Sequence, residues 1–390
     1  MRLNVWKAAL VGLGISGMPA ASAAVPERLV EVVQTPDGGI QPQAVIDAKG
    51  TVHLVYFKGE PAAGDLFYTR RERGARSFAP PLRVNSQPGS AVAIGTVRGG
   101  QLALGRGGRV HVAWNGSGKA LPKNADGSSP MLYTRSDREG RAFEPQRDLM
   151  TKTTALDGGG TVAADDAGHV YVAWHGRGDD SIPGEAGRRM WVARSDDDGA
   201  EFAPEASAFD KETGACGCCG TRALADPRGT LYLLYRSATN FVGRDMYLLT
   251  AREAGARFRG NVLAPWKVSV CPMSTESLAN APTGVLAAWE TDRRVSFVRI
   301  DPESGQPSSP VTPPGRGDRK HPAVAGNAQG ETLLAWAEGT GWQKGGALVW
   351  QLFDRSGRPM AEKGRIEDGI PIWGLPTVVA KPDGNFLIIH

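Results

Sequence analysis

Residues 161–174 read TVAADDAGHVYVAW, and they describe a β-hairpin in three parts. The apolar segment at 161–164 and the alternating segment at 169–174 both have the composition of strands. Between them, Asp165 offers a carboxylate for local hydrogen bonds, and Gly168 tolerates the positive φ that a tight turn requires. The stretch therefore predicts two antiparallel strands joined by a short turn.

The same hairpin pattern recurs along the whole chain, each time as a glycine followed five or six positions later by a large side chain. Besides Gly168 and Trp174, the pairs are Gly50 and Tyr56, Gly108 and Trp114, Gly229 and Tyr235, Gly284 and Trp289, Gly330 and Trp336, and Gly384 and His390. Successive glycines lie 46 to 61 residues apart, which is near the period of propeller blades and above that of helical solenoids. We therefore predict an all-β chain that folds as a single β-propeller.

Most repeats continue with a third strand, such as residues 190–194, and this one runs into a further motif. Ser195, Asp197, Gly199 and Phe202 give the Asp-box pattern Ser-x-Asp-x-Gly-x-x-aromatic. With this motif and this repeat, the chain resembles the sialidase-like, or BNR/Asp-box, β-propellers over nearly all of residues 25–390. The resemblance implies four-stranded blades and a structural role for the box, as a turn between the two outer strands of a blade.

The number of hairpins favours seven blades, and six remain the alternative because the resemblance to sialidases implies six. The last repeat stops at His390, so it lacks its outer strands. Residues 28–33 precede the first hairpin and have the composition of a strand, so we expect them to supply the missing strand and close the ring. Closure removes exposed sheet edges, which otherwise invite aggregation.

Residues 1–24 have the form of a cleavable signal peptide for secretion, with basic Arg2 and Lys7, an apolar stretch and small residues at 21–24. The apolar stretch is too short and too interrupted by glycine to span a bilayer. No later segment has the length of uninterrupted apolar residues that a membrane span needs. We expect residues 25–390 to reach the periplasm or the exterior of the cell and to act as a monomer.

The charge of the chain argues against one class of partner. The net charge of +4 falls to about +2 without Arg2 and Lys7, and acidic and basic residues are interspersed. Binding of nucleic acid would require a concentrated basic face. We therefore expect a small molecule, a glycan or a protein as the ligand, and no nucleic acid.

The cysteines fall in two loops that lead into consecutive predicted blades. Cys216, Cys218 and Cys219 precede one inner strand, and Cys271 precedes the next, followed by Met273. In a propeller these loops share one face with the loops between second and third strands, and we call it the mouth face. The predicted ligand-binding residues of this face are His175, Arg177, Arg236, Arg244 and Asp245.

Three interpretations of the cysteines stay open. An exported protein with four cysteines favours two disulfides. Because the adjacent Cys218 and Cys219 would close a strained ring, pairing Cys271 with one member of the cluster, and Cys216 with another, is easier. The thiolates, with Met273 and His175 nearby, also suit copper or zinc as Cu(I) or Zn(II). Reactive redox thiols are the third interpretation.

The residues around these cysteines also resemble a subgroup of exported sialidase-like proteins. That subgroup has Cys-x-Cys-Cys followed by a Tyr-Arg strand end, an Arg-Asp pair and a Cys-Pro. Matching residues here are 216–219, 235–236, 244–245 and 271–272. The resemblance implies membership of the subgroup and no particular activity.

Sialidase chemistry requires three arginines that clamp the substrate carboxylate, a tyrosine nucleophile assisted by a glutamate, and an aspartate acid/base. The resemblance implies that the first clamp arginine lies in an Arg-Ile-Pro sequence, which does not occur in this chain. We therefore predict a propeller that binds a ligand, such as a glycan or another anionic group, at its mouth without sialidase turnover.

Two alternatives belong to other functional classes. One is a periplasmic protein that handles copper or zinc, or exchanges thiols, through the cysteine cluster. The other is a divergent glycoside hydrolase, for which the available carboxylates are Asp179, Asp180, Asp245 and Glu290. Three tryptophans outside the repeated position are candidates for stacking on a sugar, namely Trp342, Trp350 and Trp373.

Overall fold

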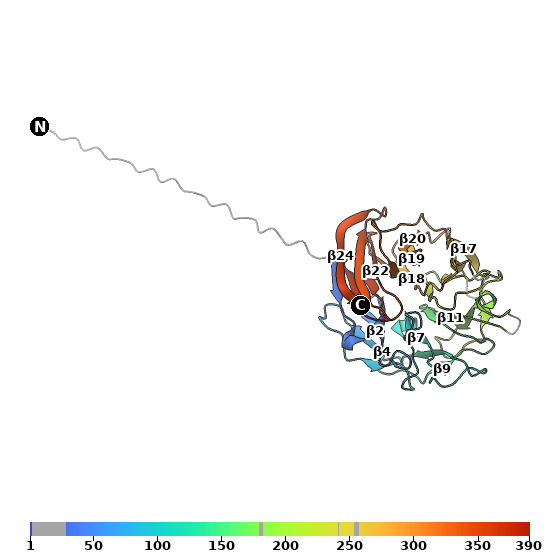
Figure 1. Cartoon of the computed structure of the whole chain (residues 1–390). Helices are drawn as coiled ribbons and strands as arrows, with labels where there is room; N and C mark the ends of the chain where they lie inside the picture. Colours follow the sequence, from blue (N-terminus) through green and yellow to red (C-terminus); the bar gives the residue numbers. More distant parts are fainter. Residues whose placement is uncertain (2–28, 179–181, 241, 253–256) are drawn as a thin grey trace.

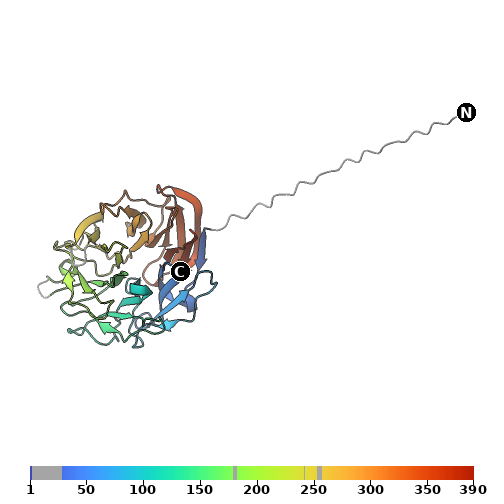
Figure 2. The same cartoon turned by 180° about the vertical axis from the view of Figure 1, so that it is seen from behind.

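The computed structural model describes the chain except for residues 2–28, 179–181, 241 and 253–256. The described residues form a ring of sheets, and the colours run once around the ring from the first blade to the C-terminus (Figure 1). The view from behind shows the same closed ring (Figure 2). The expected signal peptide lies outside the described residues. Within the described part, no helix has the length and apolar character needed to cross a membrane.

Seven sheets occur among the described residues, which confirms the all-β propeller and favours seven blades over six. Blade 1 consists of β2 (Ile40–Ile46), β3 (Val52–Lys58), β4 (Asp65–Arg71) and β5 (Leu82–Arg83). Blade 2 consists of β6 (Gln101–Leu104), β7 (Val110–Asn115), β8 (Met131–Arg135) and β9 (Arg147–Asp148). Blade 3 consists of β10 (Thr161–Ala164), β11 (Val170–Gly176), β12 (Arg189–Ser195) and β13 (Ala206–Ser207).

The remaining blades complete the ring. Blade 4 consists of β14 (Thr221–Ala225), β15 (Leu231–Arg236), β16 (Met246–Ala251) and β17 (Arg259–Ala264). Blade 5 has β18 (Ser277–Ala281), β19 (Gly284–Thr291) and β20 (Arg294–Ile300), and blade 6 has β21 (Arg319–Gly326), β22 (Thr332–Glu338), β23 (Gly346–Phe353) and β24 (Pro359–Ile370). Blade 7 has β25 (Thr377–Ala380), β26 (Phe386–Ile389) and β1 (Val30–Val33). Short 3-10 turns are η1 (Pro36–Gly38), η2 (Arg106–Gly108) and η3 (Glu185–Gly187).

Blade 5 has no regular fourth strand among the described residues, unlike the four-stranded blades that the sequence predicted. After β20 the chain forms isolated bridges to it at Pro307 and Val311. Prolines at 302, 307, 310, 313 and 314 have no N–H to donate to a ladder, which explains why a continuous strand does not form here.

Blade 7 is closed by the N-terminal strand, as predicted for residues 28–33. β1 pairs with β26 in a parallel register from Val30 opposite Phe386 to Val33 opposite Ile389. The N–H and the hydroxyl of Thr35 both donate hydrogen bonds to the carbonyl oxygen of His390, at 2.6 and 2.8 Å. The two ends of the described chain therefore hold the ring together, in a blade of three strands.

The hydrophobic core lies between neighbouring blades, and the repeated large side chains fill it. Tyr56, Trp114, Trp174, Tyr235, Trp289 and Trp336 are all buried. Trp174 of blade 3, for example, packs with Ala113 and Tyr133 of blade 2. Burial of one such side chain contributes about 1.5–3 kcal/mol, so the repeat stabilises the contact between adjacent blades.

The mouth face gathers loops that are distant in the sequence. Bridges join loops that lead into blades with loops that follow second strands: Ala91 pairs with Gly64 and Gly116, Thr154 with Arg177, and Lys267 with Gly243. On the opposite face the inner and outer hairpin turns meet, since the N–H of Asp198 donates to the carbonyl oxygen of Gly168. This is the division of loops that the sequence predicted.

A buried carboxylate fixes one of the mouth-face loops. Glu205, only 1% exposed, accepts hydrogen bonds from the backbone N–H groups of residues 151–153 at 2.8–3.1 Å. It also accepts from the hydroxyls of Thr151 and Thr153 at 2.6 and 2.9 Å. Burial alone would raise the pKa of Glu205, but hydrogen bonds from Thr151 and Lys152 lower it below its ordinary value.

We expect Glu205→Gln to lower the free energy of unfolding by about 3 kcal/mol at pH 7, because a buried charge-assisted acceptor is lost. Because the folded-state pKa of Glu205 is depressed, its contribution is present above the ordinary carboxyl range and is lost as pH falls through the folded pKa. Urea unfolding at pH 7 and pH 3 measures this, with the exposed Glu201→Gln as control. A cost of Glu205→Gln no larger than that of the control would contradict the assignment.

Candidate functional site

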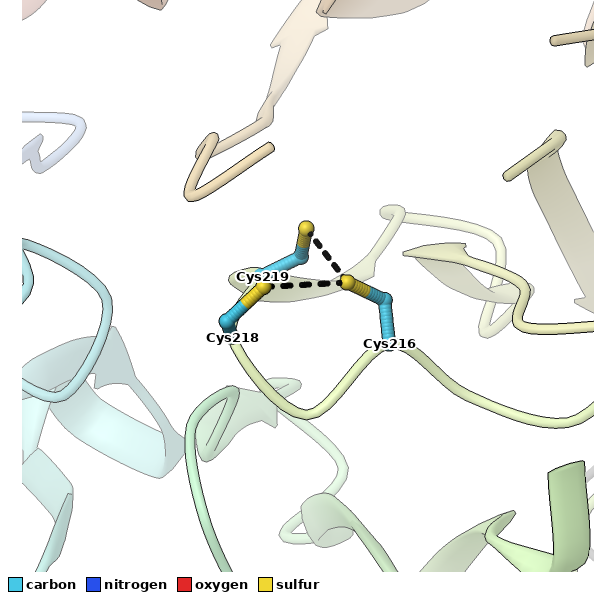
Figure 3. A group of neighbouring side chains, drawn as sticks. All are labelled: Cys216, Cys218 and Cys219. Atoms are coloured by element: carbon cyan, nitrogen blue, oxygen red, sulfur yellow. Dashed lines mark hydrogen bonds between the residues drawn. The ribbon is translucent and has the colours of Figure 1, made fainter. Parts of the chain in front are cut away.

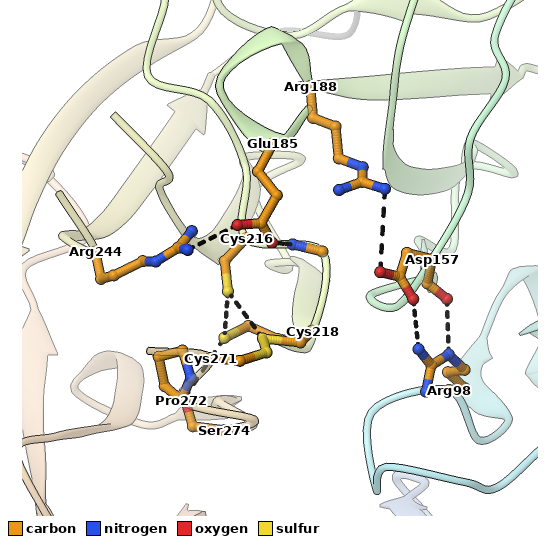
Figure 4. Close-up of a disulfide and its surroundings, with 12 residues drawn as sticks. Arg98, Asp157, Glu185, Arg188, Cys216, Cys218, Arg244, Cys271, Pro272 and Ser274 are labelled. Atoms are coloured by element: carbon orange, nitrogen blue, oxygen red, sulfur yellow. Dashed lines mark hydrogen bonds and ion pairs between the residues drawn. A yellow bond between two sulfur atoms is a disulfide. The ribbon is translucent and has the colours of Figure 1, made fainter. Parts of the chain in front are cut away.

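The four cysteines converge at the mouth face, on the side of blades 4 and 5. Cys218 and Cys271 form a disulfide with their Cα atoms 6.3 Å apart, which links the loops leading into these blades (Figure 4). Cys216 and Cys219 are buried thiols. The Sγ of Cys216 lies 2.9 Å from that of Cys219 and 3.4 Å from that of Cys218 (Figure 3). We call these four residues the cysteine cluster.

The backbone around the cysteine cluster explains its compactness. The N–H of Cys216 donates a hydrogen bond to the carbonyl oxygen of Arg236. The N–H of Cys219 donates one to the carbonyl oxygen of Cys216. The N–H of Gly217 donates to Glu185 Oε1 at 2.7 Å. A Cβ at residue 217 would lie 2.6 Å from Arg188 Nη1 and 2.8 Å from Asp157 Oδ2, so a larger residue here would require these two side chains to shift.

The two thiols share one proton readily. Burial opposes ionisation of Cys219, but the hydrogen bond from Cys216 and the charge of Arg236 lower its pKa to about 7. The hydrogen bond to Cys219, and then burial, raise the pKa of Cys216. A thiolate at Cys219 that accepts a hydrogen bond from the Cys216 thiol is therefore accessible near neutral pH.

The predicted arginines lie beside the cysteine cluster but are engaged within the protein. Buried Arg236 donates to the carbonyl oxygens of Arg244 and Glu290 and lies over the ring of Trp266, 4.9 Å from its centroid. Arg244 donates to Glu185 Oε2 at 2.7 Å (Figure 4). Neither guanidinium projects from the rim, where an anionic ligand would meet it.

The remaining predicted residues of the mouth face separate into different surroundings. Asp245 accepts a hydrogen bond from the N–H of Trp266 at 2.8 Å and therefore caps that loop instead of orienting an arginine. Arg177 pairs through its backbone with Thr154. Met273 has a φ of +46° and lines a small cavity with Lys320, His321 and Trp373. Asp179 and Asp180 lie outside the described residues.

His175 is inside the protein, whereas the sequence suggested a rim position. Within the described structure, neither of its ring nitrogens has a hydrogen-bond partner. Burial, and then the charge of Arg188, lower its pKa to about 3, so the ring is neutral at physiological pH. A Cβ added at Gly159 would lie 3.0 Å from His175 Nε2 and 2.7 Å from Thr221 Oγ1, so these two groups face the same narrow space.

Two further buried carboxylates lie near the cluster: Glu276, which was not among the predicted site residues, and Glu290, which was predicted as an available carboxylate. Both carboxylate oxygens of Glu276 lack a partner among the described residues, and so does Oε2 of Glu290. Burial, and then the charge of Cys219, raise the pKa of Glu276 to about 8. Burial also raises the pKa of Glu290. Glu276 directly precedes β18 and Glu290 lies within β19, so the spacing of residues along the chain does not single out either position as part of a site.

The candidate stacking tryptophans do not form one surface. Trp350 lies on β23, where its ring occupies the space above Gly364. Trp373 is buried, and its ring meets that of Trp342 edge to face with centroids 4.6 Å apart. Trp342 is 56% exposed, so it is the member of this set that offers a face to solvent.

The predicted Asp-box residues form a compact turn between β12 and β13, away from the mouth. Ser195 Oγ donates to Asp197 Oδ1 at 2.7 Å and accepts from the N–H of Gly199 at 2.9 Å. Phe202 packs edge to face on Tyr133 of blade 2, with ring centroids 4.9 Å apart. These contacts join blades and provide no group for chemistry on a ligand.

No sequence-family profile and no curated protein sequence matches the chain. A solved structure of a protein of unknown function from Dyadobacter fermentans DSM 18053 is similar, with a TM-score of 0.51 and 13% identity over 80% of this chain and 94% of that one. An α-L-arabinanase from Penicillium chrysogenum, complexed with arabinobiose, has a TM-score of 0.53 and 13% identity, and the match covers 82% of this chain and 94% of the arabinanase. A Trypanosoma rangeli sialidase, in complex with the inhibitor DANA, has a TM-score of 0.52 and 10% identity, and the match covers 80% of this chain and 54% of the sialidase.

The chain therefore has a β-propeller fold similar to those of this arabinanase and this sialidase, which is the fold that the sequence resemblance predicted. It spans about half the length of the Trypanosoma rangeli sialidase. Identities of 10–13% establish the fold alone, because one fold hosts many unrelated functions. The function must be argued from the cysteine cluster and its surroundings.

Proposed function

We propose that this propeller is an exported protein that binds a soft metal ion, Cu(I) in preference to Zn(II), at the cysteine cluster. One observation carries the proposal: the thiols of Cys216 and Cys219 are buried together, with their Sγ atoms 2.9 Å apart. The Sγ atoms of Cys216, Cys218 and Cys219 all lie within 4.8 Å of one another, and because Cys218 is in the disulfide, the thiolates that one ion can reach together are those of Cys216 and Cys219. Thiolates are the ligands that select Cu(I).

The number of available thiolates favours copper over zinc. Structural zinc sites use four ligands, whereas the disulfide leaves two thiols, Cys216 and Cys219. Two thiolates around a monovalent cation carry a net charge of about −1. Arg236 and Arg244 act electrostatically on these two cysteines and compensate such a charge.

The same surroundings give less support to the glycan hypothesis. Arg236 and Arg244, the arginines expected to clamp an anionic sugar, bind carbonyl oxygens and Glu185 inside the protein. The cavity beside Met273 on the mouth face has a volume of about 20 Å³, which is far below that of a typical pocket for a small organic ligand.

Competition for Cu(I) tests the proposal. The purified mature protein, kept anaerobic with ascorbate, is titrated into the coloured complex of Cu(I) with bicinchoninate. We expect one equivalent of copper to leave the chelator, because the cysteine cluster is a single site. Retention of all copper by the chelator at excess protein would overturn the proposal. N-terminal sequencing of the exported protein tests cleavage near residue 24 in the same preparation.

Glycan binding remains a second candidate because of one observation. Trp342 is exposed beside Trp373, and an exposed tryptophan supported by a second ring can stack on a sugar face. Quenching of tryptophan fluorescence by sialyllactose, in the parent protein and in Trp342→Ala, tests this candidate. We expect no release of sialic acid from a fluorogenic sialoside in either protein.

A further inference from the structure

The channel through the propeller is lined by the inner strands of every blade. It has a volume of about 270 Å³, and its wall comes from β2, β6, β10, β14, β18, β21 and β25. Most of the wall is Ala, Val, Leu or Ile, as expected where alternate residues of a strand face inward. The polar residues on this wall are few, so their chemistry defines what the channel can hold.

Arg222 is the charged residue among those that line the channel. Its Nη1 donates to the carbonyl oxygen of Thr221 at 3.1 Å. In the described part of the chain, no carboxylate forms an ion pair with it within 4 Å; Glu276 is the acidic group that acts on it at longer range.

Three hydroxyl groups on the channel wall accept hydrogen bonds from the neighbouring blade. Thr161 Oγ1 accepts a hydrogen bond from the N–H of Ala223 at 3.0 Å. In the same way, Ser277 Oγ accepts a hydrogen bond from the N–H of Val324 at 3.3 Å. Thr377 Oγ1 accepts a hydrogen bond from the N–H of Ala44 at 3.2 Å. With its oxygen engaged by the neighbouring blade, each hydroxyl retains its hydrogen for a partner in the channel.

From these observations we infer that the channel binds a small monovalent anion, a halide or a short carboxylate, at Arg222. The Arg222 guanidinium is half-buried at the channel wall and has no ion-pair partner within 4 Å among the described residues, so an anion in the channel can pair with it. The hydroxyls of the wall supply additional donors, and no ionised side chain of the wall repels the anion. This inference does not depend on copper binding, because it uses none of the cysteines.

The test measures thermal unfolding of the mature protein in sodium bromide or sodium acetate, with sodium gluconate keeping the ionic strength constant. We expect the midpoint temperature of unfolding to rise by about 2 °C or more as the concentration of bromide or acetate increases, since a ligand that binds the folded state stabilises it. Arg222→Gln should abolish this rise. Arg259→Gln, which removes an exposed arginine of the same blade, should retain it. A response to acetate alone identifies a carboxylate site, and a response to both salts identifies a general anion site.

The second measurement uses crystals of the unaltered protein soaked in bromide. It needs no variant, so it tests the inference even if Arg222→Gln does not fold. We expect an anomalous peak within hydrogen-bonding distance of the Arg222 guanidinium. An equal rise in midpoint for the parent protein and Arg222→Gln would overturn the inference. So would a channel without bromide in crystals that bind bromide elsewhere.

Discussion

The double variant Cys216→Ser, Cys219→Ser is expected to fold and to lose affinity for Cu(I) by a factor of at least about 10³. Serine is close to cysteine in size, so the loop keeps its packing, but a hydroxyl is a poor ligand for a soft ion. The backbone hydrogen bonds of Cys216 to Arg236 and of Gly217 to Glu185 remain available. Chelator competition measures the affinity, and circular dichroism verifies the fold.

Cys271→Ser is the matched control for that experiment. It opens the disulfide and leaves Cys218 as a third thiol next to Cys216, 3.4 Å away between the Sγ atoms. We expect copper affinity to be retained or increased, while the free energy of unfolding falls by about 2–4 kcal/mol because a cross-link is lost. If the double serine variant binds copper as tightly as the parent protein, the thiols are not its ligands.

Removal of the closing strand is expected to have the largest effect on stability. A chain that begins at Gln34 lacks β1, and should lose about 5 kcal/mol relative to a chain that begins at Leu29. It gives up the pairing of Val30–Val33 with β26 and the packing of Leu29, Val30 and Val32 against blade 7. It also turns β26 into an exposed edge, which favours aggregation.

Urea unfolding and size-exclusion chromatography of the two chains measure this prediction. The chain that begins at Leu29 is the control, because it keeps the complete strand. Equal stability of the two chains, with both monomeric, would show that the ring is closed without β1. That result would contradict the account of blade 7.

The fold was predictable because its signals are local. The turn at residues 165–168 is set by its first and last residues. The Asp165 carboxylate accepts a hydrogen bond from the N–H of His169, and Gly168 has a φ of +94°. Each hairpin repeats this logic, so the number of blades follows from the number of turns. The missing fourth strand of blade 5 also has a local cause, in the prolines between residues 302 and 314. The repeat alone, without those prolines, predicted four strands for this blade.

The site was predictable only in part because it is built from distant loops. Propeller topology brought Cys216 and Cys271 to one face, and Cys271 pairs with Cys218, as predicted for one of two disulfides. The second predicted disulfide, of Cys216, was wrong, because Cys216 and Cys219 are free thiols. The burial of Arg236 and the pairing of Arg244 with Glu185 depend on side-chain packing across blades 3, 4 and 5. Spacing along the chain does not encode such contacts. Glu276 was missed for the same reason.

X-ray absorption at the copper edge tests the central claim most directly, because it identifies the atoms bound to the metal. The mature protein loaded with one equivalent of Cu(I) is predicted to have a first shell of two sulfur atoms, from Cys216 and Cys219, and no nitrogen or oxygen. The Cys216→Ser, Cys219→Ser variant should lose that sulfur shell. A first shell of nitrogen or oxygen atoms in the parent protein would contradict the proposal that the cysteine cluster holds the metal.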